Sequence, residues 1–202
     1  MEGQFNRIMI DDQVIQPPAA LAPILRDTEQ IGFTMASEPQ TGALLRALAA
    51  SKPGGRFLEL GTGTGVGAAW ILDGMDSASL LDTVDKNPTA QEIARRHLGN
   101  DLRVTFHLEE GEVFLERAQQ PFDFIFADAW AGKFDCLDLA LGLLRPGGIY
   151  VVDDLLPQKS WPDGHETKIP GFIAEMEKRR DFVIVKLAWG SGLMVAIRKR
   201  SE

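Results

Sequence analysis

The stretch FLELGTGTGVGAAW, residues 57–70, interrupts an apolar run with glycines at alternate positions. Glycine tolerates positive φ and carries no Cβ, so the backbone of such a loop can lie close to a ligand. Asp85 follows at about the 20-residue spacing at which a carboxylate accepts hydrogen bonds from ribose hydroxyls. Together with Asp85, four loop residues predict a nucleotide-like ligand: Gly61, Gly63, Gly65 and Gly67.

Two classes of cofactor suit this loop, a dinucleotide and a methyl donor. The segment GTGVGA, residues 63–68, matches the G-x-G-x-x-A pattern of dinucleotide binding, although a lone match is weak support. Glu59 precedes the loop at the end of a predicted strand, where its carboxylate would repel a pyrophosphate but could hold an ammonium group. The spacing of the residues leaves both classes open, and Glu59 favours the methyl donor.

Three more carboxylates, Asp128, Asp153 and Asp154, follow two later strand-like segments. The carboxyl ends of parallel strands meet at one edge of a sheet, and carboxylates gathered there repel one another unless a cation or proton intervenes. Oxygen ligands suit Mg²⁺, Ca²⁺ or Mn²⁺. These three residues therefore predict a divalent-cation site; in the alternative, Asp128 serves the cofactor and the other two cap a turn.

His165 and two tryptophans are candidates for the acceptor side of the site. His165 lies in the segment LLPQKSWPDGHE, residues 155–166, and an imidazole has a pKa suited to proton transfer. Trp130 and Trp161 could form apolar walls for a flat acceptor. The alternative for His165 is a surface residue that opens the next helix.

The elements that must position these residues alternate along the chain. Near-continuous apolar runs predict parallel strands covered on both faces, with helices between them. Pro88 suits the first turn of a helix, and Gly147-Gly148 predict the end of another. The predicted strands are 56–60, 79–85, 102–107, 122–128 and 148–154, and the predicted helices are 65–75, 88–98, 111–119, 134–144 and 166–180.

The ends of the chain complete the predicted fold. Residues 182–189 and 193–200, joined by Gly-Ser-Gly, predict an antiparallel hairpin at the edge of the sheet. We therefore expect an α/β, Rossmann-like, doubly wound sheet of seven mostly parallel strands, with helices on both faces. Residues 1–202 form one predicted domain, in which 1–50 are a helical cover over the carboxyl edge and 51–202 the core.

Bulk composition excludes several classes of function. The chain has 202 residues, 45% of them hydrophobic and 25% charged, which is typical of a globular protein. A formal net charge of −8 argues against nucleic acid as a partner. One cysteine, Cys136, forms no internal disulfide, and neither a signal peptide nor a membrane span is evident. A cytoplasmic protein without membrane partners is expected.

The segments LELGTGTG, VDKNP, FDFIFADAW and LLRPGGIYVVDD resemble the successive motifs of class I S-adenosylmethionine-dependent methyltransferases. The catechol and caffeoyl-CoA O-methyltransferase group is the most similar, and the resemblance covers roughly residues 33–156 and the terminal hairpin. It implies O-methyl transfer from S-adenosylmethionine to a small hydroxylated acceptor. It also implies cofactor contacts at Met35 and Ser37, at Glu59 and Gly61 to Gly67, at Asp85 and Lys86, at Gly111 and Glu112, and at Asp128 and Trp130.

The same resemblance bears on catalysis. In the family, two Asp and one Asn hold a divalent metal, and here Asp154 stands at the Asn position. The family's lysine falls on Ala131, so Lys133 is the candidate base, unless it is merely solvated. The candidate catalytic residues are thus Lys133, His165 and Asp128. Relatives often form dimers, which makes a homodimer a possible state. An NAD-dependent oxidoreductase or a non-catalytic nucleotide-binding protein is the alternative.

Overall fold

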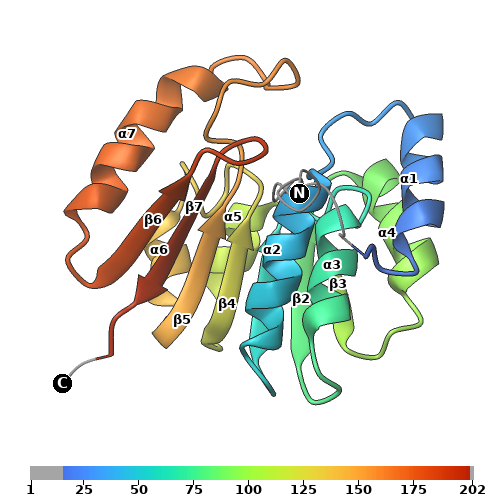
Figure 1. Ribbon diagram of the computed structural model, residues 1–202, viewed down its shortest axis with the longest axis horizontal. Coiled ribbons are helices and arrows are strands. Elements are labelled where there is room, and N and C mark those ends of the chain that lie inside the picture. Colours follow the sequence, from blue (N-terminus) through green and yellow to red (C-terminus); the bar gives the residue numbers. More distant parts are fainter. Residues whose placement is uncertain (1–15, 201–202) are drawn as a thin grey trace, which may run out of the picture.

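The computed structural model describes residues 16–200. They form one seven-stranded sheet in the order β3-β2-β1-β4-β5-β7-β6 (Figure 1). The first five strands in the chain pair in parallel, and β7 pairs antiparallel with both β5 and β6. The strands are β1 Arg56–Leu60, β2 Leu80–Asp85, β3 Val104–Leu108, β4 Phe122–Ala127, β5 Leu144–Val152, β6 Phe182–Leu187 and β7 Leu193–Arg198. The predicted mostly parallel sheet with a terminal hairpin is confirmed.

Helices cover both faces of this sheet (Figure 1). The helices α5, α6 and α7 pack on one face, and α1 to α4 contribute to the core on the other. Their bounds are α1 Leu21–Gln30, α2 Pro39–Ala50, α3 Val66–Gly74, α4 Pro88–Leu98, α5 Gly111–Arg117, α6 Leu137–Gly142 and α7 His165–Lys178. None of the helices in residues 16–200 is long and apolar enough to cross a membrane.

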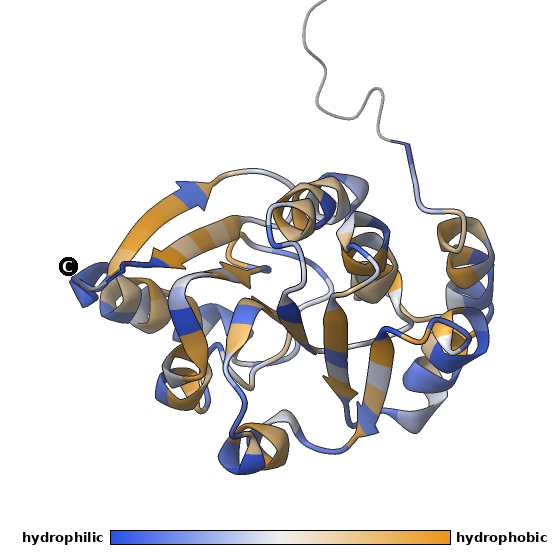
Figure 2. Cartoon of the chain, turned by 90° about the horizontal axis from the view of Figure 1, so that it is seen from below, coloured by the Kyte–Doolittle hydropathy of each residue, from blue (hydrophilic) through white to orange (hydrophobic). Residues whose placement is uncertain are grey.

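Alternation along β1 shows how the two cores form. Phe57 packs in the core on the α1–α4 side, whereas Leu58 and Leu60 pack in the core on the α5–α7 side. Figure 2 shows the strands of the centre in mostly hydrophobic colours. Because successive strand side chains point to opposite faces, Glu59 lies on the same side as Phe57. The sheet therefore carries a carboxylate into the α1–α4 core next to α3.

The N-terminal helices lie beside the sheet. Helix α2 packs on α3, and α1 packs on α3 and α4. Residues 33–37, which connect α1 to α2, line the carboxyl edge together with the glycine loop. The sequence predicted a helical cover over this edge. What the structure places at the edge is the segment that connects α1 to α2. Residues 1–15, also assigned to that cover, lie outside the described part of the chain.

The predicted boundaries of one helix and of the strand that follows it are wrong. The helix expected at 134–144 spans only Leu137–Gly142, and β5 begins at Leu144, before the Pro-Gly-Gly segment that was expected to precede it. Phe122 pairs with Leu144 and its N–H donates to Leu143 O at 2.8 Å, while the register between β4 and β5 shifts before Phe124. The irregular glycine segment is therefore absorbed as a bulge inside the strand.

The close approach of α2 and α3 yields a prediction. A Cβ built on Gly74 would lie 2.2 Å from the backbone oxygen of Arg46, so Gly74→Ala must push the two helices apart. We expect it to lower the free energy of unfolding by about 1–3 kcal/mol, measured by urea denaturation.

The matched control is Gly171→Ala in α7, where no atom lies within 4 Å of the built Cβ. Alanine suits an open helical position better than glycine, so this variant should be neutral or more stable by up to about 1 kcal/mol. Equal losses in both variants would contradict the packing argument.

Candidate functional site

The glycine loop connects β1 to α3 at the carboxyl edge of the sheet. Gly61 has φ +104°, and a Cβ there would lie 2.8 Å from the backbone oxygen of Asp128. Its N–H donates to Val84 O at 2.9 Å. The loop is thus held between the ends of β2 and β4, in a conformation that a larger residue would disturb.

Glu59 is fully buried beneath this loop. Its Oε2 accepts a hydrogen bond from the Thr83 hydroxyl, which lies 2.7 Å from the hydroxyl of Thr62. Its Oε1 has no hydrogen-bond partner among the described residues, and a Cβ on Gly67 would lie 2.4 Å from it. Burial raises the pKa of Glu59 to about 8. Glu59 is therefore a buried acceptor with one unused oxygen, which a donor or cation could satisfy.

Asp85 is fixed against the loop. Its Oδ2 accepts from Gly63 N at 2.6 Å, and its Oδ1 accepts from Asn87 N at 2.8 Å. The carboxylate is half-buried, so part of it faces outward. The adjacent Lys86 is exposed, and its Nζ lies 3.3 Å from Glu110 Oε2. A turn at the end of β2 therefore holds the predicted ribose-binding carboxylate at the glycine loop.

The remaining predicted cofactor residues surround the same edge. A small hollow is lined by the glycine loop, Met35, Ser37 and Asp128, and the hydroxyl of Ser37 donates to Asp128 Oδ2 at 3.3 Å. Met35 is 54% exposed, so it is free to contact a bound molecule. Gly111 and Glu112 begin α5, where a Cβ on Gly111 would lie 2.5 Å from Ala131 Cβ.

The predicted carboxylate group forms at the ends of β4 and β5. Asp153 is 2% exposed, and its Oδ1 accepts from the Ser191 hydroxyl and, at 2.8 Å, from Asp154 N. Burial raises the pKa of Asp153 to about 6. The pKa of Asp128 is also raised well above its ordinary value, by desolvation first and then by Asp153 and Asp154. These groups repel one another's negative charge, as the sequence indicated.

Lys133 is 1% exposed, so the alternative of a solvated lysine is wrong. Desolvation lowers its pKa, while Asp128, Asp154 and Asp153 oppose that shift by favouring the ammonium form. Its Nζ lies 5.6 Å from the centre of the Phe134 ring. Lys133 therefore supplies a buried basic group beside the carboxylates.

The arrangement does not support the predicted divalent-cation site at Asp128, Asp153 and Asp154. Within residues 16–200, no three or more His, Cys, Asp or Glu side chains are placed to hold one ion. Oδ1 of Asp153 accepts hydrogen bonds from the Ser191 hydroxyl and from Asp154 N. The described residues therefore give no geometric support for the predicted metal, and the site stays a prediction from the sequence.

His165 begins α7 and is 3% exposed, so it is not a surface residue. Its Nδ1 accepts from Trp130 Nε1 at 3.2 Å, and its Nε2 lies 3.0 Å from the backbone oxygen of Asp154. Because an indole only donates and a carbonyl only accepts, the ring is the neutral Nε2–H tautomer. Burial lowers its pKa, which agrees with this form. Both nitrogens are engaged, so the geometry favours positioning over proton transfer.

The aromatic side chains gather around His165. Trp161 stacks on the imidazole with ring centres 4.6 Å apart, and Phe134 and Trp130 lie within 5.0 and 6.4 Å. Lys168 Nζ lies 4.7 Å from the centre of the Trp130 ring. The predicted contact of Trp130 with an adenine stays a prediction; in this structure its indole is bonded to His165.

Some residues of the site had little or no signal in the sequence. Thr83 is a polar residue inside a buried strand, and this is the one feature of the sequence that indicates a hydrogen-bond partner for Glu59. The sequence predicts Ser191 only as part of a hairpin turn. In the structure its hydroxyl donates to Asp153 and lies 3.0 Å from Glu38 Oε2. The contact spans residues 38 to 191, and short-range patterns carry no information on such a pairing.

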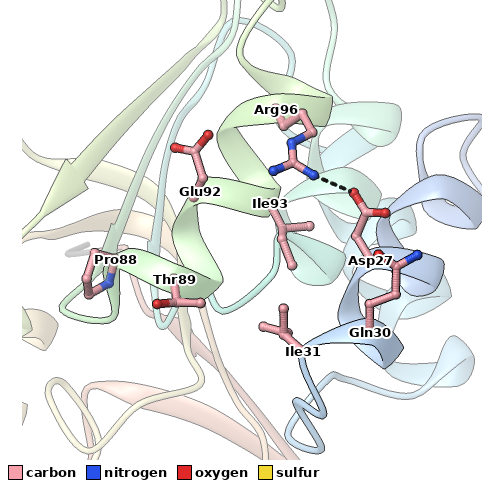
Figure 3. Close-up of a pocket in the computed structure, with 8 residues that line it drawn as sticks. All are labelled: Asp27, Gln30, Ile31, Pro88, Thr89, Glu92, Ile93 and Arg96. Carbon is pink, nitrogen blue, oxygen red and sulfur yellow. Dashed lines mark hydrogen bonds and ion pairs between the residues drawn. The ribbon is translucent and has the colours of Figure 1, made fainter.

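A separate hollow of about 580 Å³ lies between α1 and α4 (Figure 3). Figure 3 shows Arg96 directed at Asp27 across it, and their Nη1 and Oδ2 are 3.1 Å apart. Ile31 and Ile93 supply its apolar lining. None of the residues predicted to bind the cofactor or to act in catalysis lines this hollow.

Comparisons with known proteins agree with this geometry. A family model described as "Methyltransferase domain" matches residues 58–155. A protein of Mycolicibacterium smegmatis, named as an O-methyltransferase, is 30% identical over 93% of this chain and 94% of its own length. A Mycobacterium protein with the same description is 32% identical over 70% of this chain, and the match covers 66% of that relative.

Solved structures show the same fold. The O-methyltransferase TomG from Streptomyces achromogenes, crystallised with SAM, superposes with a TM-score of 0.80. The two chains are 22% identical, and the alignment covers 93% of each. At this identity the likeness bears on the fold alone.

The raised pKa of Glu59 gives a prediction for stability. Unfolded glutamate has a pKa of about 4.5, against about 8 in the fold. Between these values the folded chain holds a proton that the unfolded chain has released, so stability falls as pH rises. Glu59→Gln removes the cost of ionising, or of keeping protonated, a buried carboxyl group at high pH. We expect this variant to be more stable than the wild type by about 1–3 kcal/mol at high pH, with a smaller gain near pH 5.

The measurement is urea unfolding at pH 5.5 and 8.5, with Glu92→Gln as the control because Glu92 is exposed on α4. Glu92→Gln should show the same difference from the wild type at both pH values. A pH-independent effect of Glu59→Gln would contradict the assignment of a buried protonated carboxyl.

Proposed function

The chain belongs to the methyltransferase family that includes these O-methyltransferases, and we propose that it transfers a methyl group from S-adenosylmethionine to a hydroxyl of a small acceptor. The observation that carries this proposal is the pair of carboxylates at the glycine loop. Glu59 offers a buried oxygen without a partner, and Asp85 is held at the loop by Gly63 N. These features suit a ligand with an ammonium group and ribose hydroxyls, and they disfavour a pyrophosphate.

The residues present fit this cofactor. Glu59 would stabilise the positively charged methionine end, Asp85 would accept from the ribose hydroxyls, and Met35 would cover the ligand. When bound, S-adenosylmethionine supplies a methyl group already activated by its sulfonium. The chain therefore has two remaining tasks, which are to orient the acceptor and to remove its proton.

We assign proton removal to Asp128 and Lys133 acting as a pair. Burial raises the pKa of the carboxyl and lowers that of the amine, which brings the two proton affinities toward each other. Coupled groups of this kind titrate as a unit. The proton of the acceptor hydroxyl would pass to this pair, while His165 holds Trp130 and the Asp154 backbone in place.

The acceptor is proposed only as a small hydroxylated molecule. The aromatic group of Trp130, Phe134 and Trp161 next to the carboxylates supports a flat acceptor. A cytoplasmic location and a homodimer stay predictions from the sequence.

Cofactor identity can be tested by thermal shift with S-adenosylhomocysteine and NAD⁺. At a 100-fold excess over its Kd, a ligand adds about 2.7 kcal/mol of stability, or about 5–10 °C in Tm for a chain of this length. We expect this shift with S-adenosylhomocysteine and none with NAD⁺. Stabilisation by NAD⁺ alone would favour the oxidoreductase alternative and contradict the proposal.

Asp85→Asn should weaken S-adenosylhomocysteine binding roughly 10- to 100-fold, because the neutral amide is a poorer acceptor than a carboxylate. Asp73→Asn is the control, since Asp73 forms a surface ion pair with Arg46 at 2.9 Å. Calorimetric titration gives both affinities. An unchanged affinity for Asp85→Asn would remove this residue from the site.

If Lys133 takes part in proton removal, its loss should slow methyl transfer without weakening cofactor binding. Lys133→Ala should lower kcat for methyl transfer by about 100-fold or more while S-adenosylhomocysteine affinity stays within about twofold. Formation of S-adenosylhomocysteine with a panel of phenols and catechols measures the rate, and Lys178→Ala, at a side chain 76% exposed, is the control. A full rate for Lys133→Ala would exclude the pair as the base.

A further inference from the structure

We propose that helix α1 belongs to the cofactor site, with Thr28 as a positioning residue that holds the glycine loop and the segment 33–37 in their binding geometry. The inference rests on the proposed function, because it concerns the affinity of the chain for S-adenosylmethionine. Thr28 is not among the residues that line the hollow at the glycine loop, so it acts through residues that do.

The side chain of Thr28 bonds α1 to the glycine loop. Its Oγ1 lies 2.8 Å from Oγ1 of Thr64 and 2.7 Å from Ile24 O. A carbonyl only accepts and a hydroxyl carries one proton, so the Thr28 proton goes to Ile24 O and the Thr64 hydroxyl donates to Thr28. Thr28 is 5% exposed and Thr64 is 1% exposed. Loss of the Thr28 hydroxyl would therefore leave a buried donor of the loop itself without an acceptor.

The backbone of Thr28 sets the direction of the segment that follows α1. Phe33 N donates to Thr28 O at 3.2 Å. Gly32, which has φ +66°, donates its N–H to Glu29 O at 3.0 Å. This pair of bonds is a Schellman motif, which ends a helix and fixes the course of the chain beyond it. Phe33 is thereby placed against the glycine loop, where a Cβ on Gly63 would lie 3.2 Å from Phe33 Cζ.

Helix α1 is also fixed to α4, beside the hollow in Figure 3. Asp27 Oδ2 lies 3.1 Å from Arg96 Nη1 (Figure 3) and 2.8 Å from His97 Nε2, and both partners belong to α4. Helix α4 follows the turn that holds Asp85. Adjacent residues of α1 therefore contact two parts of the predicted cofactor site: Thr28 contacts the glycine loop, and Asp27 contacts the helix behind the ribose-binding turn.

This arrangement predicts an effect on cofactor binding rather than on the chemical step. Gly63 of the loop donates to Asp85, so a loop that loses its support from α1 would disturb both groups of predicted cofactor contacts. A loop that is already ordered also loses less conformational freedom when the ligand binds. Asp128 and Lys133, which are assigned to proton removal, follow β4 instead. We therefore expect Thr28 to affect affinity and to leave the rate at saturation almost unchanged.

The test is calorimetric titration of the full chain with S-adenosylhomocysteine. Valine has the shape of threonine without its hydroxyl, so Thr28→Val should bind about tenfold more weakly. Thr28→Ser keeps the hydroxyl and should bind within about twofold of the wild type. The matched control is Thr41→Val in α2, where a fully buried threonine has no hydrogen-bond partner for Oγ1 among the described residues. Its affinity should equal that of the wild type.

Kinetics separate positioning from a general loss of structure. With an acceptor, Thr28→Val should raise KM for S-adenosylmethionine about tenfold and leave kcat within about twofold, whereas partial unfolding would lower kcat instead. Wild-type affinity in Thr28→Val, or equal losses in Thr28→Val and Thr41→Val, would overturn this inference alone. Failure of the wild type to bind S-adenosylhomocysteine would overturn the proposed function, and this inference with it.

If Thr28→Val does not fold, amide hydrogen exchange of the wild type decides. S-adenosylhomocysteine should slow exchange in α1, residues 21–30, together with the glycine loop, residues 61–65, because the two are bonded to each other. Slower exchange in the loop with no change in α1 would overturn the inference.

Discussion

The constraint on which the site depends is the burial of negative charge at the carboxyl edge of a parallel sheet. Glu59 and Asp153 are almost completely excluded from solvent. Asp128 follows β4, which lies between β1 and β5, the strands that carry Glu59 and lead to Asp153. Each buried carboxylate must be protonated, hydrogen-bonded or paired. The Thr83 hydroxyl at Glu59 and the Ser191 hydroxyl at Asp153 each supply such a hydrogen bond.

The sheet order explains how distant segments come to meet these needs. Strands β2, β1, β4 and β5 lie side by side, so their ends bring Asp85, Glu59, Asp128 and Asp153 to one edge. The terminal hairpin joins β5 antiparallel and carries Ser191 back to the same edge. The connection between α1 and α2 adds Ser37 from the opposite end of the chain. Positive charge is scarce there, which fits a site that receives a positively charged methyl donor.

Local patterns in the sequence were sufficient for much of the fold. Apolar runs, the proline at the start of α4 and the Gly-Ser-Gly turn predicted the strands, one helix boundary and the hairpin. Asp85 followed from its spacing to the glycine loop. The sequence did not reveal that Lys133 is buried. The hydrogen bond from the Tyr150 hydroxyl to Gly132 O, which ties the turn before Lys133 to β5, joins residues far apart in the sequence. The convergence of three carboxylates was foreseeable, but their hydrogen-bond partners were not, and the metal site stays a prediction from the sequence.

The central claim is that a buried, protonated carboxyl group becomes charged when the positively charged donor binds. Calorimetric titration of S-adenosylmethionine at pH 7, in buffers of different ionisation enthalpy, measures the protons exchanged on binding. Because burial raises the pKa of Glu59 to about 8 and a bound cation favours its charged form, the account predicts net proton release that is reduced in Glu59→Gln. Binding without proton release, or release unchanged in Glu59→Gln, would contradict it.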